Sequence, residues 1–224
     1  MHRSPSRRAF AALAATAVAG CLSVPNRHAS NDEPANESDP DDNSGLRDRV
    51  QTNCTTSMAS PDPYPDLQIE YDDVPEDAGV AMCVQAVQPF TDDSPAKIAV
   101  ELTNVSDSSA TYGFGISPPW GGVFAEHVQQ EATLIFVPDY REHVGSEGLI
   151  PQRATDGCWR AQSLYSGEDI GLTATVDPAE TIREEYTILA AEGSACLTQG
   201  TYRSEEAHYD PVPDAWGFDI TLSA

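Results

Sequence analysis

The chain has 224 residues and is strongly acidic, because 36 Asp and Glu residues stand against 12 Lys and Arg residues and give a net charge of -24. This charge argues against nucleic acid as a partner, since nucleic-acid binding depends on cationic side chains that neutralise phosphates. It argues equally against electrostatic attachment to anionic lipids.

The N-terminus has the features of an export signal that ends in a lipid-attachment cysteine. Arg7-Arg8 precedes an apolar, alanine-rich run from Ala11 to Ala17 and then Val18-Ala19-Gly20-Cys21. The run is shorter than the roughly 20 apolar residues that span a membrane, so residues 1–20 are predicted to be a twin-arginine signal peptide. The Val-Ala-Gly-Cys ending resembles the lipobox of exported lipoproteins. We therefore expect a mature protein that starts at a lipidated Cys21 and is anchored to the extracellular face of the cell membrane. The alternative is an ordinary secreted protein cut near Gly20.

The acidic residues are spread over the whole chain. Residues 1–20 hold three of the basic residues (Arg3, Arg7 and Arg8) and no acidic one, so the mature chain has 36 acidic against 12 - 3 = 9 basic residues, or a charge of -27. With Lys97 as its one lysine, this composition resembles that of proteins from salt-loving archaea. In molar salt the screening length falls to about 3 Å, which suppresses self-repulsion. The resemblance implies a halophilic, haloarchaeal lipoprotein; the alternative is an ordinary soluble acidic domain.

Residues 21–62 are predicted to be the lipidated N-terminus and a disordered acidic linker. Proline recurs among Asn, Asp, Ser and Glu with almost no aliphatic run, so this segment cannot bury enough apolar surface to offset the entropy lost on ordering. We expect it to act as a tether between membrane and domain. Sequons for N-glycosylation lie within it at Asn36 and Asn53, and a third begins further on at Asn104.

Residues 63–224, about 160 residues, suffice for one domain with its own core. Apolar and polar residues alternate along 97–102 and 111–116, and this period of two predicts half-buried strands. The turn formers at 104–109 between them predict a hairpin. Further strands are predicted at 80–87, 132–137, 159–163, 170–176, 182–189, 200–203 and 216–222. Many short strands separated by turn signals favour an all-β fold, an antiparallel sandwich of two sheets.

Four motifs resemble those of bacterial and archaeal Ig-like domains. In order, they are Val100-Glu-Leu-Thr-Asn104-Val-Ser-Asp107, Gly157-Cys-Trp159, Asp177-Pro-Ala-Glu180 and Leu197-Thr-Gln-Gly-Thr-Tyr-Arg203. The resemblance implies an Ig-like β-sandwich after the signal peptide and tether. The chain departs from the family pattern in lacking glycine in the third motif and in a long insertion between Gly115 and Gly157. Because these are packing and turn motifs, they specify a fold better than a role.

Four cysteines remain besides Cys21, an even number that fits disulfide bonds in an oxidising compartment. Three pairings are possible. We favour Cys158 with Cys196, which both come shortly before predicted strands, and Cys54 with Cys83. Metal ligation is the alternative, but no Cys-x-x-Cys or Cys/His spacing supports it.

No sequence motif identifies a catalytic site, since no histidine lies in His-Glu-x-x-His and no serine in Gly-x-Ser-x-Gly. A copper electron carrier needs Cys, His and Met on one late loop, whereas His208 follows Cys196 at a distance and the last methionine is Met82. We therefore expect a non-catalytic surface module without a cofactor that binds an extracellular protein or glycan. The alternatives are a proteinase-inhibitor-like domain, an extracytoplasmic enzyme and a copper electron carrier.

Ser117-Pro-Pro-Trp120-Gly-Gly122 interrupts the alternating pattern, so this stretch is predicted to be a loop at one end of the sandwich. Loops carry function disproportionately, and tryptophan is enriched in binding hot spots. Trp120 is therefore a candidate binding residue, and residues 117–131 are a candidate recognition loop. The alternative is that the Trp120 ring folds back and caps the core.

Overall fold

The computed structural model describes residues 42–140, 145, 148–167, 170–206 and 215–224. The expected signal peptide, the lipidated Cys21 and the sequon at Asn36 lie outside the described residues. The elements in chain order are α1 (Asp42–Thr52), β1 (Ser57–Met58), β2 (Asp66–Tyr71), η1 (Glu76–Ala78), β3 (Val80–Gln88), β4 (Lys97–Asn104), β5 (Ala110–Phe114), β6 (Phe124–His127), β7 (Thr133–Pro138), β8 (Leu172–Val176), β9 (Thr181–Ala190), β10 (Gly200–Glu206) and β11 (Trp216–Ser223).

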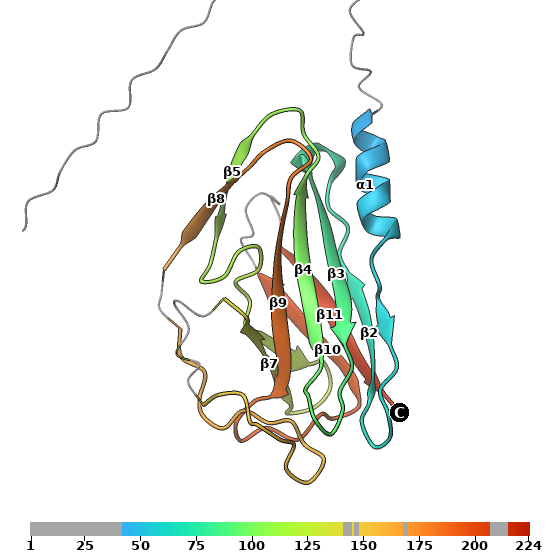
Figure 1. The fold of residues 1–224 in the computed structure, drawn as a ribbon, viewed down its shortest axis with the longest axis vertical. Helices are drawn as coiled ribbons and strands as arrows, with labels where there is room; N and C mark the ends of the chain where they lie inside the picture. Colours follow the sequence, from blue (N-terminus) through green and yellow to red (C-terminus); the bar gives the residue numbers. More distant parts are fainter. Residues whose placement is uncertain (1–41, 141–144, 146–147, 168–169, 207–214) are drawn as a thin grey trace, which may run out of the picture. The chain divides into compact units, whose positions relative to one another are not determined.

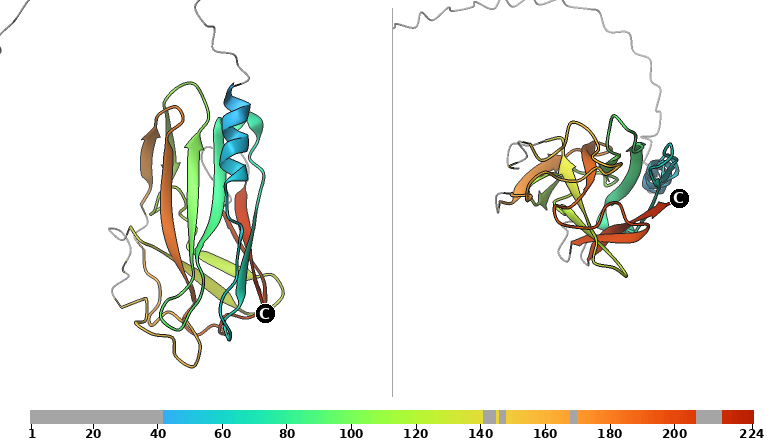
Figure 2. Two further views of the ribbon diagram at one scale, coloured as in Figure 1. Left: turned by 45° about the vertical axis from the view of Figure 1, so that its right-hand side comes forward. Right: turned by 90° about the horizontal axis from the view of Figure 1, so that it is seen from below.

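Nine strands form one antiparallel sheet in the order β1-β2-β11-β10-β6-β7-β9-β4-β3, and β5 pairs with β8 in a separate two-stranded sheet. The large sheet rolls up until its two ends meet, where the Ala86 N–H of β3 donates to the Thr55 carbonyl just before β1, at 2.7 Å. Figures 1 and 2 show two layers of strands, with β3, β4 and β9 in front of β10 and β11. The antiparallel all-β sandwich predicted from the period of two is confirmed.

The core between the layers is filled by alternate side chains of the facing strands. Along β11, Phe218, Ile220 and Leu222 are buried, whereas the two residues between them remain partly exposed, as the two-residue period of a strand requires. The largest buried side chains include the three tryptophans of the chain, Trp120, Trp159 and Trp216. Burial contributes roughly 25 cal/mol per Å² of apolar area removed from water, so these rings are major stabilising elements.

The predicted hairpin of residues 97–102 with 111–116 is wrong. β4 pairs with β3 on one side and with β9 on the other, while β5 pairs with β8. Because both edges of β4 are occupied, the chain leaves the large sheet after Asn104. The Asn104 amide holds this corner, since its Nδ2 donates to the carbonyls of Ser108 (2.8 Å) and Val176 (2.9 Å). The turn formers therefore mark a crossover between sheets.

The strand predicted at 159–163 is also wrong, because only a single bridge, from Arg160 to Ala190, pairs this segment with β9. The segment is nevertheless anchored, since the Ala190 N–H donates to the Trp159 carbonyl at 2.9 Å and the Trp159 ring N–H donates to the Thr91 carbonyl at 2.7 Å. Five elements have no counterpart in the sequence prediction: α1, β1, β2, η1 and β6.

The linker predicted over 21–62 is too long, because regular structure begins at α1. The Arg47 guanidinium on α1 donates to the carbonyls of Val74 (3.0 Å) and Glu76 (3.1 Å), and Cys54 is bonded to Cys83 of β3. The Cys54–Cys83 disulfide and the hydrogen bonds of Arg47 hold α1 on the domain, although the low apolar content of this segment predicts disorder. Both favoured disulfides, Cys54–Cys83 and Cys158–Cys196, are present in the structure.

Candidate functional site

Trp120 is a core residue and not a surface contact. Its side chain is 0% exposed and packs edge-on against Trp216, with ring centroids 5.3 Å apart. The buried Tyr186 hydroxyl donates to the Trp120 carbonyl at 2.6 Å and so holds the backbone of this loop against the core. The hypothesis that Trp120 is a binding residue is therefore contradicted.

The predicted recognition loop, residues 117–131, also contains a strand, β6. The large apolar side chains that it does expose are Phe124, which is 47% exposed and packs edge-on against Tyr165, and Val128, which is 57% exposed. Neither was singled out from the sequence. The exposed aromatic side chain of this stretch is therefore Phe124 and not Trp120, whose ring turns into the core.

The two described sequons differ in accessibility. Asn53 is exposed just after α1. Asn104 is fully buried, and its amide is saturated, because Nδ2 makes the two corner bonds and Oδ1 accepts from the N–H (2.9 Å) and the hydroxyl (2.7 Å) of Ser106. A glycan on Nδ2 would replace an N–H that the corner uses and would need space that the core does not have. The structure contradicts Asn104 as an acceptor in the folded domain.

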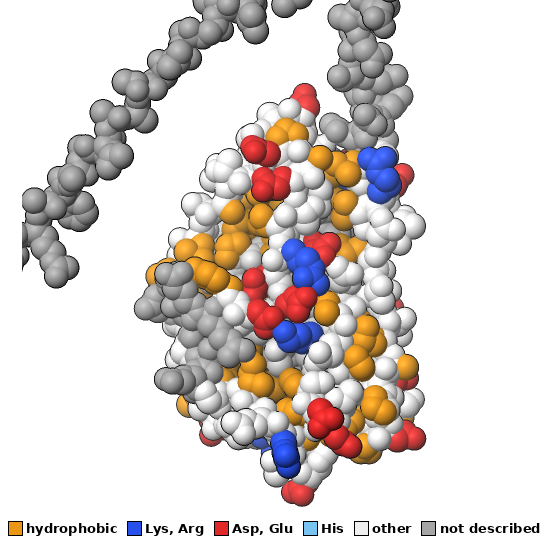
Figure 3. All heavy atoms as spheres, viewed as in Figure 1, with side chains coloured by type: hydrophobic (Ala, Val, Ile, Leu, Met, Phe, Trp, Pro, Cys, Tyr) orange, Lys and Arg blue, Asp and Glu red, His pale blue; other side chains and the backbone are white. Residues whose placement is uncertain are grey.

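An open groove of about 440 Å³ lies between β8 and the first half of β9. The residues that line it define what we call the β8–β9 groove: Pro118, Tyr140, Leu172, Thr173, Ile182, Arg183 and Glu184. β8 and β9 leave a common turn and then diverge, because β8 pairs with β5 and β9 with β4 (Figure 1). In the same view, Figure 3 shows apolar side chains gathered over β5 and β8, beside charged ones over β4 and β9.

The first half of β9 has an edge that is unpaired among the described residues. Its neighbour β7 ends with Pro138 opposite Tyr186, and the Asp139 N–H then donates to the Glu185 carbonyl at 2.9 Å. Along an antiparallel strand, the N–H and C=O of every second residue point to the same side. The backbone groups of Arg183 therefore point the same way as those of Glu185, away from β4 and towards the groove.

β8 has a corresponding free edge within the described part of the chain. The Leu172 N–H donates to the Gly115 carbonyl on the β5 side, at 3.3 Å. By the same alternation the backbone groups of Thr173 and Thr175 point to the side opposite β5. The Thr111 and Thr175 hydroxyls lie 2.8 Å apart, which fits the close approach of side chains in a pair without backbone hydrogen bonds.

Charge is distributed unevenly around the groove. On the outer face of β9, Arg183 donates to Glu101 (2.8 Å) and Glu185 (2.8 Å). Glu184 points the other way and lines the groove. Burial raises the pKa of its carboxyl group, and a hydrogen bond from the Tyr140 N–H, at 2.6 Å, opposes that shift. The groove thus has an apolar lining that contains one half-buried carboxyl group.

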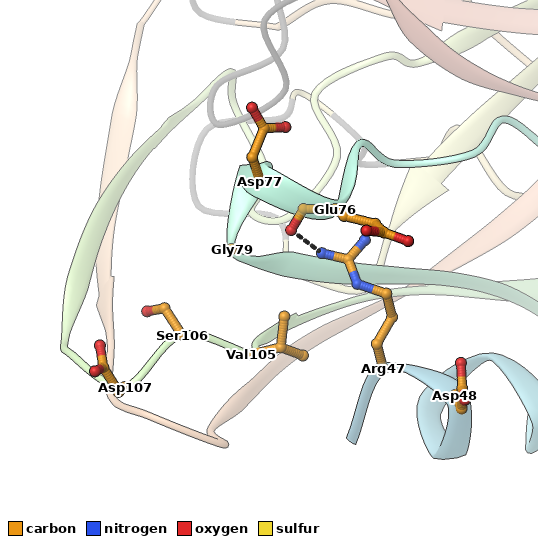
Figure 4. Close-up of a pocket in the computed structure, with 8 residues that line it drawn as sticks. All are labelled: Arg47, Asp48, Glu76, Asp77, Gly79, Val105, Ser106 and Asp107. Atoms are coloured by element: carbon orange, nitrogen blue, oxygen red, sulfur yellow. Dashed lines mark hydrogen bonds between the residues drawn. The ribbon is translucent and has the colours of Figure 1, made fainter. Parts of the chain in front are cut away.

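A second cleft, of about 460 Å³, lies between α1 and the corner of the two sheets. Figure 4 shows Arg47 reaching across it to the Glu76 carbonyl, while the carboxyl groups of Asp48, Asp77 and Asp107 lie apart from one another. Because these carboxylates do not converge, we interpret this cleft as the seam along which α1 docks. A third cleft, of about 440 Å³, lies beside the Cys158–Cys196 bridge, where Arg160 is tied to the Ser194 carbonyl at 2.9 Å.

Sequence reasoning predicted the strands on both sides of the β8–β9 groove but not the groove. The alternation of Ile182 and Glu184 was visible, and it predicts that both side chains face one side of a strand. What no local pattern contains is the divergence of β8 from β9, because that depends on the pairing of β8 with the distant strand β5.

Within the described ranges, no group of three or more His, Cys, Asp or Glu side chains is arranged to hold a metal ion. No helix of the described part is long and apolar enough to cross a membrane. Neither a family model, nor a curated protein, nor a solved structure matches the chain. The resemblance to Ig-like domains therefore stays a prediction from the quoted motifs.

Proposed function

We propose that this protein is a surface lipoprotein, anchored by a lipid on Cys21, that binds an extracellular protein or glycan through its β-sandwich and catalyses no reaction. The Arg7-Arg8 pair and the lipobox-like Val18-Ala19-Gly20-Cys21 support export and anchoring. The net charge of -24 supports a partner other than nucleic acid and a halophilic setting.

The observation that carries the binding role is the β8–β9 groove. This open groove is lined mainly by apolar side chains, holds one half-buried carboxyl group and lies beside two strand edges that no other described strand pairs with. It has the mixture of apolar area and polar groups that binding sites use.

Capture from native membranes in molar salt tests this role. Ile182 is half-buried on the groove, so Ile182→Asp should abolish capture of any partner that the wild type retains after cross-linking. Val128→Asp is the matched control, because it makes the same change in charge at a 57% exposed apolar residue just after β6, away from the groove. Equal capture by wild type and both variants would exclude the groove, and turnover of an added substrate would favour an enzyme.

Anchoring is tested separately with Cys21→Ser. This variant should leave the membrane fraction and appear as a soluble protein, because removal of the sulfur removes the lipid attachment point. If the variant stays in the membrane fraction, the lipid on Cys21 is not the anchor.

A further inference from the structure

We infer that the β8–β9 groove binds an extended segment of a partner protein as an added β-strand, and that this segment has apolar side chains and a Lys or Arg that faces Glu184. The inference rests on the proposed binding function and specifies the chemistry of its partner.

The backbone groups needed for strand addition are present on both sides of the groove. Thr173 of β8 and Arg183 of β9 both line the groove, and the alternation of backbone groups along each strand turns their N–H and C=O groups away from β5 and β4, respectively. Peptides that add to a sheet edge gain affinity from such main-chain hydrogen bonds and specificity from alternate side chains. A strand between β8 and β9 would join the two-stranded sheet to the large one.

β8 lacks the features that normally prevent such pairing. Natural proteins protect free edges with charged residues, proline or bulges. The β8 sequence Leu172-Thr-Ala-Thr-Val176 contains no charge and no proline, and its register with β5 continues without a bulge. An edge of β-branched and small residues is therefore left open beside an apolar groove.

The side chains of the groove determine which segment fits. Every second residue of an added strand would face inwards, towards Leu172, Ile182 and Pro118, which favours apolar residues at those positions. The outward residues would lie beside the exposed Thr173 and Arg183 and can be polar. An alternating segment of this kind has the period that a half-buried strand requires.

The charge of Glu184 determines which residue the partner segment needs at one of its inward-facing positions. The Glu184 carboxyl lines the groove, and no described cationic side chain forms an ion pair with it, since Arg183 bonds to Glu101 and Glu185 on the other face. A Lys or Arg of the partner would complement this carboxyl and also the charge of -24 on the whole chain. A half-buried pair is screened less by salt than a surface pair.

The test is fluorescence anisotropy in molar KCl with defined peptides. The probe is a blocked eight-residue peptide of alternating Val and Thr with one central Val replaced by Arg. The same peptide with Glu at that position should bind about tenfold more weakly, because a carboxylate there meets Glu184. A third peptide, N-methylated at alternate residues so that one edge cannot donate, should lose most of the binding. Equal binding of all three peptides, or of none, would overturn the inference.

Protein variants locate the binding. Thr173→Pro removes the N–H that points into the groove and should lower the affinity for the Arg peptide by about tenfold or more. Thr173→Val keeps that N–H and should bind the Arg peptide as the wild type does. Glu184→Gln should remove the preference for Arg over Glu. Circular dichroism must show that Thr173→Pro is folded; if it is not, the N-methylated peptide decides the question on wild-type protein.

Two further outcomes separate this inference from the proposed function. If Thr173→Pro and the wild type capture the same membrane partner equally, strand addition is wrong and the binding role stands. If the wild type self-associates at the concentrations used for the peptides, and Thr173→Pro does not, a second copy occupies the groove and the peptide partner is wrong. Loss of capture in Ile182→Asp with no effect of Thr173→Pro would likewise contradict strand addition alone.

Discussion

At the scale of single residues, Glu206 is a half-buried carboxylic acid at the end of β10. Burial raises its pKa from 4.5 to about 7, although the Gly121 N–H, which donates to it, opposes the shift. Because the folded state disfavours the charged form, the stabilising contribution of Glu206 is complete below pH 4.5 and is lost as the pH rises through about 7.

We therefore predict that the melting temperature in molar KCl falls between about pH 5 and about pH 8, and that Glu206→Gln makes this fall smaller, because an amide does not ionise. Thermal unfolding followed by circular dichroism measures both. Glu70→Gln, at an exposed position on β2, is the control and should follow the wild type. Identical pH profiles for the wild type and Glu206→Gln would show that Glu206 does not contribute.

The sequons give a second prediction at this scale. In protein from a host that makes N-glycans, peptide mapping should find a glycan on Asn53 but none on Asn104, because Asn53 is exposed and Asn104 is saturated inside the corner. Asn104→Ala should lower the free energy of unfolding by about 1–3 kcal/mol, since the Val176 carbonyl loses its buried donor and the corner loses its bond to Ser108, whereas Asn53→Ala should change it little. A glycan on Asn104 in folded, cooperatively melting protein would contradict the assignment.

Trp120 shows where prediction from sequence reaches its limit for a single side chain. The prolines and glycines around it correctly indicate a break in the strand pattern. They do not reveal that Trp216 and Phe218, almost 100 positions later, provide a surface on which the ring packs at 5.3 and 5.4 Å. Whether a loop residue is buried depends on side chains that are distant in the sequence. The burial of Trp120 could therefore not be predicted from the residues around it.

At the scale of elements, the strands were predictable and their partners were not. A period of two depends only on which face of a strand is buried, so β3, β4, β7, β9 and β11 appear in the sequence close to their observed bounds. Pairing is a property of the whole fold. Neighbours in the chain such as β4 and β5 separate into different sheets because β3 and β9 already occupy both edges of β4.

α1 gives a prediction for an element that the sequence did not indicate. Its bonds to the rest of the domain include the hydrogen bonds of Arg47 and the nearby Cys54–Cys83 bridge, which closes a separation of 29 residues. In the chain-entropy model such a loop is worth roughly 3 kcal/mol. The double change Cys54→Ser and Cys83→Ser should lower the free energy of unfolding by about this amount and should increase hydrogen exchange in α1 first.

The control for this experiment is the second bridge, Cys158–Cys196, which closes a separation of 38 residues and does not involve α1. Its double serine variant should be destabilised to a similar extent, while α1 keeps its protection until the sheet unfolds. If α1 loses protection equally in both variants, the Cys54–Cys83 bridge has no specific role in holding the helix.

At the scale of the whole molecule, several cations of the described fold form ion pairs within it. Lys97 lies 2.7 Å from Asp139, Arg183 lies 2.8 Å from Glu101, and Arg203 lies 3.1 Å from Glu205. Because the chain has 36 acidic and only 12 basic residues, most acidic side chains have no cation of their own and repel one another. In dilute buffer such repulsion opposes the compact state, and at molar ionic strength it acts over only about 3 Å.

The last prediction follows from that repulsion. Raising KCl from about 0.1 M to about 2 M should raise the melting temperature, by about 2–4 °C for each kcal/mol of repulsion relieved. A variant with Asp93→Asn, Glu131→Gln and Glu192→Gln, three exposed acidic residues that form no ion pair within the described fold, should melt higher than the wild type in dilute buffer and should gain less from salt. Three Ser→Ala or Thr→Val changes at exposed positions serve as the control and should leave the salt dependence unchanged. A melting temperature that is equal at both salt concentrations would show that charge repulsion does not limit this fold, and the expectation of a halophilic protein would lose its physical basis.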